Sequence, residues 1–127
     1  SQVRMIIGIG CDIIEIERIK NALMKENFAQ KFFTEREILY CKARKVQSAS
    51  SFAARFAAKE AVVKALGTGL RECELKEIEI LNDELGKPYV KLYGSYKNLA
   101  EARGVKKIHL SLSHSQTNAM AYSIMED

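Results

Sequence analysis

The chain has 127 residues, which suits a single domain, and its 47% hydrophobic and 28% charged residues are ordinary for a soluble globular protein. The net charge of +4 favours an acidic partner, and the odd count of three cysteines argues against a disulfide framework and fits a reducing cytoplasm. The apolar runs are too short to span a bilayer, and no signal peptide is expected. Residues 1–4 are expected to be a remnant ahead of the domain, which we place at residues 5–127.

The first predicted element is a strand, Met5–Ile13, in which apolar residues alternate with a second face. That second face carries Gly8 and Gly10 beside Asp12. Glycines in a strand indicate that something approaches the backbone closely, which here would be a ligand or a neighbouring chain. An aspartate at a strand end is commonly a helix cap, and the alternative is a metal ligand.

Two helices are expected next, at Glu15–Asn27 and, behind the capping box Thr34–Glu37, up to Lys45. The stretch from Arg18 to Lys45 holds eight basic and three acidic residues, which gives a local charge of +5. Such a surface is either a solvated face or a docking surface for an acidic protein.

The stretch Phe52–Gly69 predicts a third helix, because it is rich in alanine and contains no proline or interior glycine. Phe52, Phe56 and Val63 share one face, which predicts that this face is buried. Serines at 48, 50 and 51 are the candidate N-caps, and glycines at 67 and 69 are the candidate stop.

The polar residues of this helix suggest a site. Arg55 and Lys59 are four residues apart, a like-charge spacing that makes sense if an anion lies against the pair. Glu60 and Lys64 have the same spacing, which is typical of a surface salt bridge. The alternative is a carboxylate for a metal ion with lysines for phosphates, and it requires a second carboxylate from elsewhere.

The second half of the chain predicts strands. Alternation marks Leu75–Leu81, Tyr89–Tyr93, Lys107–Ser113 and about Ala119–Met125, with a hairpin loop at Asn82–Pro88 that pivots on Gly86. A helix is expected from a cap at Ser95 to Gly104. The fold class is therefore α+β, with an antiparallel sheet and helices packed on one side. The turn Ser113-His114-Ser115 can bind phosphate or supply a base, although surface turns use the same residues.

Five motifs together resemble the holo-acyl-carrier-protein synthases, the short bacterial type of 4′-phosphopantetheinyl transferase. They are Gly8-Ile9-Gly10-Cys11-Asp12-Ile13-Ile14-Glu15, Arg55-Phe56-Ala57-Ala58-Lys59-Glu60-Ala61 through Lys64, Gly67-Thr68-Gly69, Gly86-Lys87-Pro88 and Leu110-Ser111-Leu112-Ser113-His114-Ser115. The resemblance extends from Met5 to the C-terminus. It implies the fold of that family and a homotrimer with coenzyme A in clefts between subunits.

The resemblance also implies an activity of fatty acid biosynthesis, in which the phosphopantetheine arm of coenzyme A moves to a serine of apo acyl carrier protein and adenosine 3′,5′-bisphosphate is released. Asp12 and Glu60 would hold Mg²⁺, Lys64 would stabilise charge in the reaction, and either Glu60 or a water on the metal would take the serine proton. The residues implied for coenzyme A are Arg55, Lys59, Lys64, Gly67, Thr68, Gly69, Ser113 and His114. Carrier docking is expected at Arg18, Lys25, Phe28 and Arg36.

Two other function classes were weighed. A nucleic-acid-binding module would account for the basic charge but would leave Asp12 and Glu60 unexplained, because carboxylates repel phosphates unless a metal ion lies between them. A purely structural trimer would not explain the cluster of Lys59, Glu60 and Lys64. The expected partners are therefore coenzyme A and acyl carrier protein, in the cytoplasm, without nucleic acid or membrane.

Overall fold

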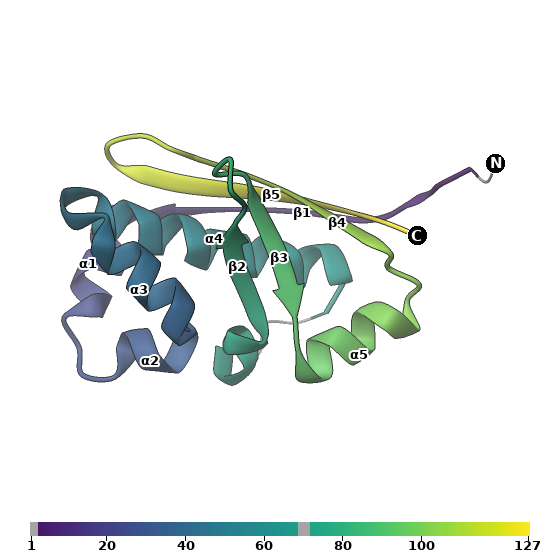
Figure 1. Ribbon diagram of the computed structural model, residues 1–127, viewed down its shortest axis with the longest axis horizontal. Coiled ribbons are helices and arrows are strands. Elements are labelled where there is room, and N and C mark those ends of the chain that lie inside the picture. The colour runs from purple at the N-terminus through teal and green to yellow at the C-terminus, as the bar shows by residue number, and fades with distance from the viewer. Residues whose placement is uncertain (1–2, 69–71) are drawn as a thin grey trace.

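The computed structural model describes residues 3–68 and 72–127 and shows an α+β architecture (Figure 1). Strands β1 (Ile6–Glu15), β5 (Asn118–Glu126) and β4 (Lys107–His114) form an antiparallel sheet in the order β1-β5-β4. Strands β2 (Ile78–Asn82) and β3 (Pro88–Leu92) form a separate antiparallel pair. The predicted antiparallel pairing is thus confirmed, and the strands are divided between two sheets.

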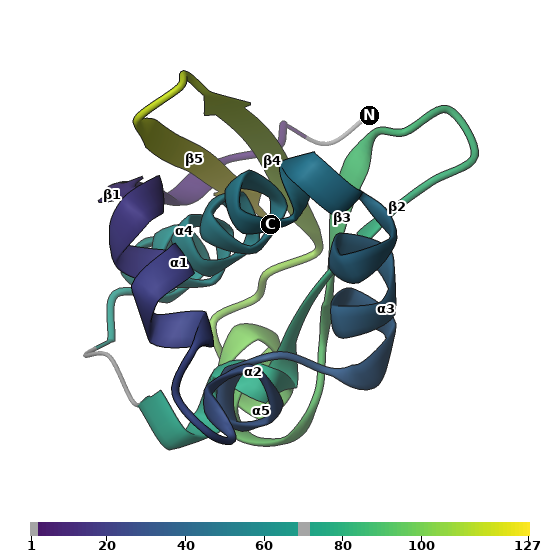
Figure 2. The ribbon, with the colours of Figure 1, turned by 90° about the vertical axis from the view of Figure 1, so that its left-hand side faces the viewer.

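Helix α4 (Ser48–Leu66) packs along the three-stranded sheet, mainly against β1 and β5. Helices α1 (Ile16–Leu23), α2 (Phe28–Phe32) and α3 (Glu35–Ala43) surround one end of α4, and α5 (Gly94–Ala102) lies toward the other (Figures 1 and 2). Short 3₁₀ helices, η1 (Lys45–Gln47) and η2 (Glu72–Glu77), precede α4 and β2. Within the described ranges, no helix has the length and apolar character needed to cross a membrane.

The helix predicted at Phe52–Gly69 is present as α4, but its start was predicted incorrectly. It begins at Ser48, so the three candidate capping serines lie in its first turns, and the N-cap position is Gln47. Ser50 Oγ donates to the Gln47 carbonyl oxygen at 3.0 Å. Gly67, with φ of 75°, ends the helix in the left-handed conformation as expected, whereas Gly69 lies outside the described residues.

The other element boundaries agree with the predictions only in part. The first predicted helix is interrupted after Leu23, and Asn27 has a left-handed φ of 68° before α2 begins. The capping box of Thr34 with Glu37 is confirmed. Ser95 is not an N-cap, because α5 begins at Gly94 and the Ser95 hydroxyl donates to Glu77 at 2.8 Å. The strand expected from Leu75 begins only at Ile78, because Leu75 belongs to η2.

The glycines of β1 allow this strand to lie directly on α4. A Cβ added at Gly10 would lie 2.0 Å from the Ala61 carbonyl oxygen, and one at Gly8 would lie 2.0 Å from that of Ala65. No side chain fits at either position. The expected close approach is therefore real, but the approaching backbone belongs to α4 of the same chain and not to a ligand or a neighbouring chain.

Lys59 is completely buried in the interior (0% exposed). Its Nζ donates to Glu37 Oε1 at 2.8 Å, to the Leu75 carbonyl oxygen at 3.0 Å and to the Ile78 carbonyl oxygen at 2.5 Å. All three ammonium donors are thus used. Burial lowers the pKa of Lys59, and the charge of Glu37 opposes that shift.

Glu37 completes this buried connection between elements. Its two carboxylate oxygens also accept the backbone N–H of Thr34 and of Ile80, each at 2.9 Å. The pair therefore ties the start of α3 and strand β2 to α4. The expectation that Lys59 contacts a phosphate is wrong for this fold, because the anion against Lys59 is the carboxylate of Glu37.

We expect Lys59→Met to lower the free energy of unfolding by about 3–5 kcal/mol, because it leaves the Glu37 carboxylate buried without its counter-charge. Chemical denaturation would measure the loss. Lys42→Met, at an exposed position of α3, is the matched control and should change stability by less than about 0.5 kcal/mol. A stable Lys59→Met protein with weakened coenzyme A binding would restore the phosphate role and contradict the structural one.

Candidate functional site

Asp12, Glu60 and Lys64 come together where β1 crosses α4, and we call this group the carboxylate site. Lys64 Nζ lies 3.2 Å from Asp12 Oδ1 and donates to the Cys11 carbonyl oxygen at 3.0 Å. The Asp12 side chain is 13% exposed and that of Lys64 is 57% exposed. Lys64 therefore pairs with Asp12 across elements, rather than forming the helix-surface pair with Glu60 that the spacing alone suggested.

The electrostatics of this site are dominated by two carboxyl groups in one place. The pKa of Glu60 is raised to about 8, mainly by partial burial and then by a hydrogen bond to Asp12 and the negative charge of Asp12, while the cations Lys64 and Arg18 oppose the shift. The two groups thus resist being ionised together. A divalent cation between them would remove that conflict.

The donor set fits magnesium bound together with a substrate. Among the residues described, no third His, Cys, Asp or Glu joins Asp12 and Glu60. Two carboxylates alone would leave most of an octahedral shell to water and phosphate oxygens, which is the coordination that Mg²⁺ favours in phosphate-handling sites. The residues present therefore fit the ion that the sequence suggested.

A second site lies beside the N-terminal half of α4. A cavity of about 490 Å³ is bordered by four basic side chains, and we call it the cationic pocket. They are Arg44, Arg55, Lys87 and His114. Its remaining walls come from the start of α4, from Asn82 and the hairpin loop after it, and from β4. Such a pocket can hold phosphate groups.

The structure divides the residues expected for coenzyme A into two groups. Arg55, Ser113 and His114 border the cationic pocket. Lys64 belongs to the carboxylate site, and Gly67 and Thr68 follow the last turn of α4. Twelve residues of helix separate Arg55 from Gly67, which is about 18 Å. One chain thus presents two half-sites, one beside the N-terminal half of α4 and one beside its C-terminal half.

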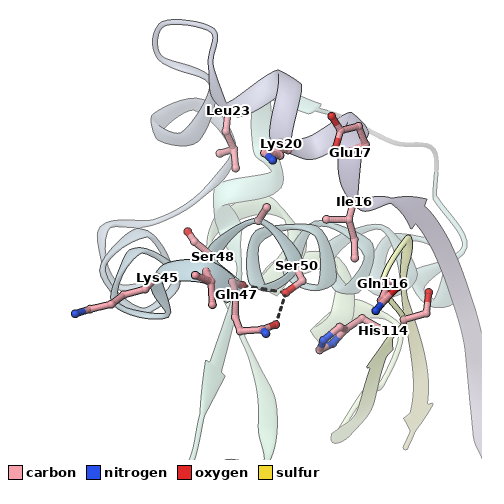
Figure 3. A pocket seen from close by; sticks show the side chains of 13 residues that line it. Ile16, Glu17, Lys20, Leu23, Lys45, Gln47, Ser48, Ser50, His114 and Gln116 are labelled. Carbon is pink, nitrogen blue, oxygen red and sulfur yellow. Dashed lines mark hydrogen bonds between the residues drawn. The ribbon is translucent and has the colours of Figure 1, made fainter.

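Beside the cationic pocket lies an open crevice of about 990 Å³ between α1, the start of α4 and the turn after β4. Figure 3 shows Lys20 and Glu17 on one side of it and His114 and Gln116 on the other. His114 borders both this crevice and the cationic pocket. The histidine thus stands at the junction of the two openings.

The residues expected to dock a carrier are only partly brought together. Arg18, Lys25 and Phe28 border one cavity of about 470 Å³ between α1, α2 and α4. Arg36 is not part of it, because its guanidinium donates to Glu79, with Nη2 2.6 Å from Oε1 and Nε 3.2 Å from Oε2. Arg36 is thereby tied to β2, but its side chain is 57% exposed, so its part in docking stays a prediction.

Sequence reasoning gave no role to several residues of the cationic pocket. Arg44 was counted only within the basic stretch, Lys87 was quoted only as part of a motif, and Asn82 was assigned only to a hairpin loop. The ring of Tyr40 lies 4.1 Å from the Arg55 guanidinium carbon and 5.8 Å from that of Arg44. The available signal was the basic residue beside the hairpin proline, which places a cation on a rigid loop.

Comparisons with known proteins show which proteins this chain is similar to. Residues 8–123 match the sequence model of the 4′-phosphopantetheinyl transferase superfamily. A holo-[acyl-carrier-protein] synthase of Clostridium tetani is 51% identical over 123 residues, which cover 96% of this chain and 97% of that protein. One of Clostridium acetobutylicum is 50% identical, with coverage of 96% and 98%.

Solved structures show the same fold. The Plasmodium yoelii acyl carrier protein synthase with ADP bound has a TM-score of 0.87 and 36% identity over 98% of both chains. The Bacillus anthracis holo-(acyl-carrier-protein) synthase in complex with CoA (3′,5′-ADP) has a TM-score of 0.81 and 38% identity, and the match covers 97% of this chain and 98% of that one. With the sequence matches, these likenesses show that the chain belongs to the 4′-phosphopantetheinyl transferase superfamily, as a member of its holo-acyl-carrier-protein synthase family of transferases.

Proposed function

We propose that this protein transfers the 4′-phosphopantetheine group of coenzyme A to a serine of apo acyl carrier protein, with Mg²⁺, as a step of fatty acid biosynthesis. The observation that carries the proposal is the convergence of Asp12, Glu60 and Lys64 from two elements that are far apart in the sequence. The family to which the chain belongs supports the same reaction.

The reaction would be a displacement at the β-phosphorus of coenzyme A. The serine oxygen of the carrier forms a bond to that phosphorus, the bond to the bridging oxygen breaks, and adenosine 3′,5′-bisphosphate leaves with the electron pair. Asp12 and Glu60 would hold Mg²⁺, which supplies charge neutralisation for the pyrophosphate. Glu60, or a water that it orients, accepts the serine proton. Lys64, exposed beside Asp12, can stabilise the charge that develops on the leaving phosphate.

Intact-mass measurement of apo carrier protein incubated with coenzyme A and Mg²⁺ tests this function. The carrier should gain one phosphopantetheine group. Asp12→Asn and Glu60→Gln should each lower the rate by about a hundredfold or more, because they remove a carboxylate from the site. Glu15→Gln, at the exposed end of the same strand, is the matched control and should retain the wild-type rate. An unmodified carrier over a range of carriers, or near-native rates in both site variants, would disprove the assignment.

The cationic pocket is proposed to hold the nucleotide end of coenzyme A, with Arg55 and His114 on its phosphates. The two half-sites face different sides of α4, because Glu60 is five residues past Arg55 and therefore points about 140° away from it around the helix. One coenzyme A would then be held by the cationic pocket of one chain and the carboxylate site, Gly67 and Thr68 of another. This arrangement requires an oligomer.

The outer face of the three-stranded sheet offers the surface for assembly. Its rows pair Ile9 with Ile124, Cys11 with Tyr122 and Ile13 with Met120. Ile9 and Ile13 are each 65% exposed, and Tyr122 is 50% exposed. A contiguous apolar sheet face of this kind marks an interaction site. We propose that it is covered by two further copies of this chain in a homotrimer.

Light scattering after size-exclusion chromatography should give three times the mass of one chain. Tyr122→Asp should shift the protein to single chains, because it buries an unpaired charge at the proposed contact. Tyr89→Asp, on an exposed tyrosine of β3, is the control with the same change. A wild-type protein that elutes with the mass of one chain, while it is active, would overturn the shared-site arrangement.

Carrier docking is proposed at the cavity bordered by Arg18, Lys25 and Phe28. Its floor is apolar, its rim is basic, and Arg18 is close enough to Glu60 to lower the pKa of that carboxyl. A helix of an acidic carrier docked there would lie beside the carboxylate site. Electrostatic attraction would then favour association and orient the reactive serine.

Arg18→Glu should raise the Michaelis constant for the carrier by about tenfold or more and leave that for coenzyme A unchanged, because rim charges act on association with the acidic partner. Kinetics with the carrier varied at two salt concentrations would measure this, and salt should weaken the wild type more than the variant. Lys97→Glu on α5 has the same charge change at an exposed position and serves as the control. An unchanged carrier constant in Arg18→Glu would move the docking surface elsewhere.

A further inference from the structure

The guanidinium of Arg55 is held in the cationic pocket in an unusual way. Arg55 is only 4% exposed, and its side chain packs on the ring of Tyr40 at 4.1 Å. Its Nη2 donates to Asn82 Oδ1, while its Nε has no hydrogen-bond partner among the residues that the structure describes. A buried cation of this kind is ordinarily paired with a carboxylate. Here the partner is a neutral amide.

Asn82 is itself fixed by the hairpin loop between β2 and β3. Its Nδ2 donates to the Gly86 carbonyl oxygen at 2.9 Å. The loop is rigid, because Asp83 Oδ1 accepts the backbone N–H of Leu85 and of Lys87, each at 2.9 Å. The orientation of the Asn82 amide is therefore set by a tight turn, and not by Arg55 alone.

The chemistry of the two partners explains why the residue is an asparagine. The Gly86 carbonyl can only accept a hydrogen bond, and the Arg55 guanidinium can only donate. An amide side chain offers one group for each. An aspartate of the same shape could hold Arg55 but would face the Gly86 carbonyl with a second acceptor, and its charge would cancel the charge of Arg55.

We propose that Asn82 is a positioning residue that holds Arg55 in the cationic pocket without neutralising it, so that the full charge remains available to a phosphate of coenzyme A. The hairpin that anchors Asn82 also supplies Lys87 to the same pocket, so one side chain fixes both cations relative to each other. This inference rests on the proposed function, because it assumes that the phosphate-bearing ligand of the pocket is coenzyme A.

The decisive variant is Asn82→Asp. It keeps the acceptor for Arg55 and cancels the charge, so the Michaelis constant for coenzyme A should rise by about tenfold, with kcat and the carrier constant within about twofold of wild type. The melting temperature should not fall enough to explain the loss, because a new ion pair replaces the bond to Gly86. If Asn82 only stabilises the hairpin, Asn82→Asp will change stability and leave the coenzyme A constant as it is.

A double-mutant cycle with Arg55→Lys provides the second readout. Asn82→Ala alone should raise the coenzyme A constant by about tenfold, and in the Arg55→Lys background it should have less than about a twofold further effect, because the group that it positions is gone. Leu85→Ala, at the exposed tip of the same hairpin, is the control and should match wild type. Additive effects would overturn the proposal.

The proposed function and the proposed role of Asn82 can be disproved independently of each other. If the wild type does not modify a carrier, the proposed function fails before any variant is measured. If the wild type is active and the Asn82 variants have wild-type constants for coenzyme A, only the role of Asn82 is wrong.

Discussion

The contact of β1 with α4 through backbone atoms is the constraint on which the site depends. Gly8 and Gly10 lie so close to the Ala65 and Ala61 carbonyl oxygens that even a methyl group would collide with them. Asp12 follows two residues later on the same face of the strand. Glu60 and Lys64 flank Ala61 on the helix, so they meet Asp12 as a consequence of this packing. The two carboxylates of the proposed metal site are thus placed by glycine and alanine residues, whose side chains take no part in that site.

The opposite side of α4 is fixed by a different kind of interaction. Lys59 and Glu60 are adjacent, so they point about 100° apart around the helix. Lys59 reaches the buried Glu37 carboxylate and two carbonyl groups, while Glu60 faces Asp12. A buried ion pair contributes little net stability compared with apolar packing, but its geometry is directional. It therefore fixes the rotation of the helix about its axis, and with it the direction of Glu60.

The features that the sequence predicted correctly are those set by residues close together in the chain. The helix stop at Gly67, the capping box at Thr34 and the hairpin at Gly86 were all recognisable, and the family motifs named Asp12 and Glu60. The structural role of Lys59 was not recognisable from the sequence, because its counter-charge comes from Glu37, 22 positions earlier on another helix. The alternation from Leu75 predicted a strand, but Leu75 lies in a 3₁₀ helix, where its carbonyl oxygen accepts a hydrogen bond from Lys59, which is distant in the sequence. Asn82 looked like any loop residue, because its partner on α4 is distant in the sequence.

The partner of each cation, and not its burial, separates Lys59, which has a structural role, from Arg55, which we propose binds a phosphate. Lys59 and Arg55 lie on the same helix and are both buried, but Lys59 faces a carboxylate and Arg55 faces an amide. The charge of Lys59 is balanced within the fold and can only be exposed by breaking it. The charge of Arg55 is held in place and left unbalanced, which costs stability unless an anion arrives. Lys64 lies between these two cases, because it pairs with Asp12, which we propose as a ligand of the metal ion. An unbalanced cation beside an open cavity is therefore the physical reason for proposing that this pocket binds a phosphate.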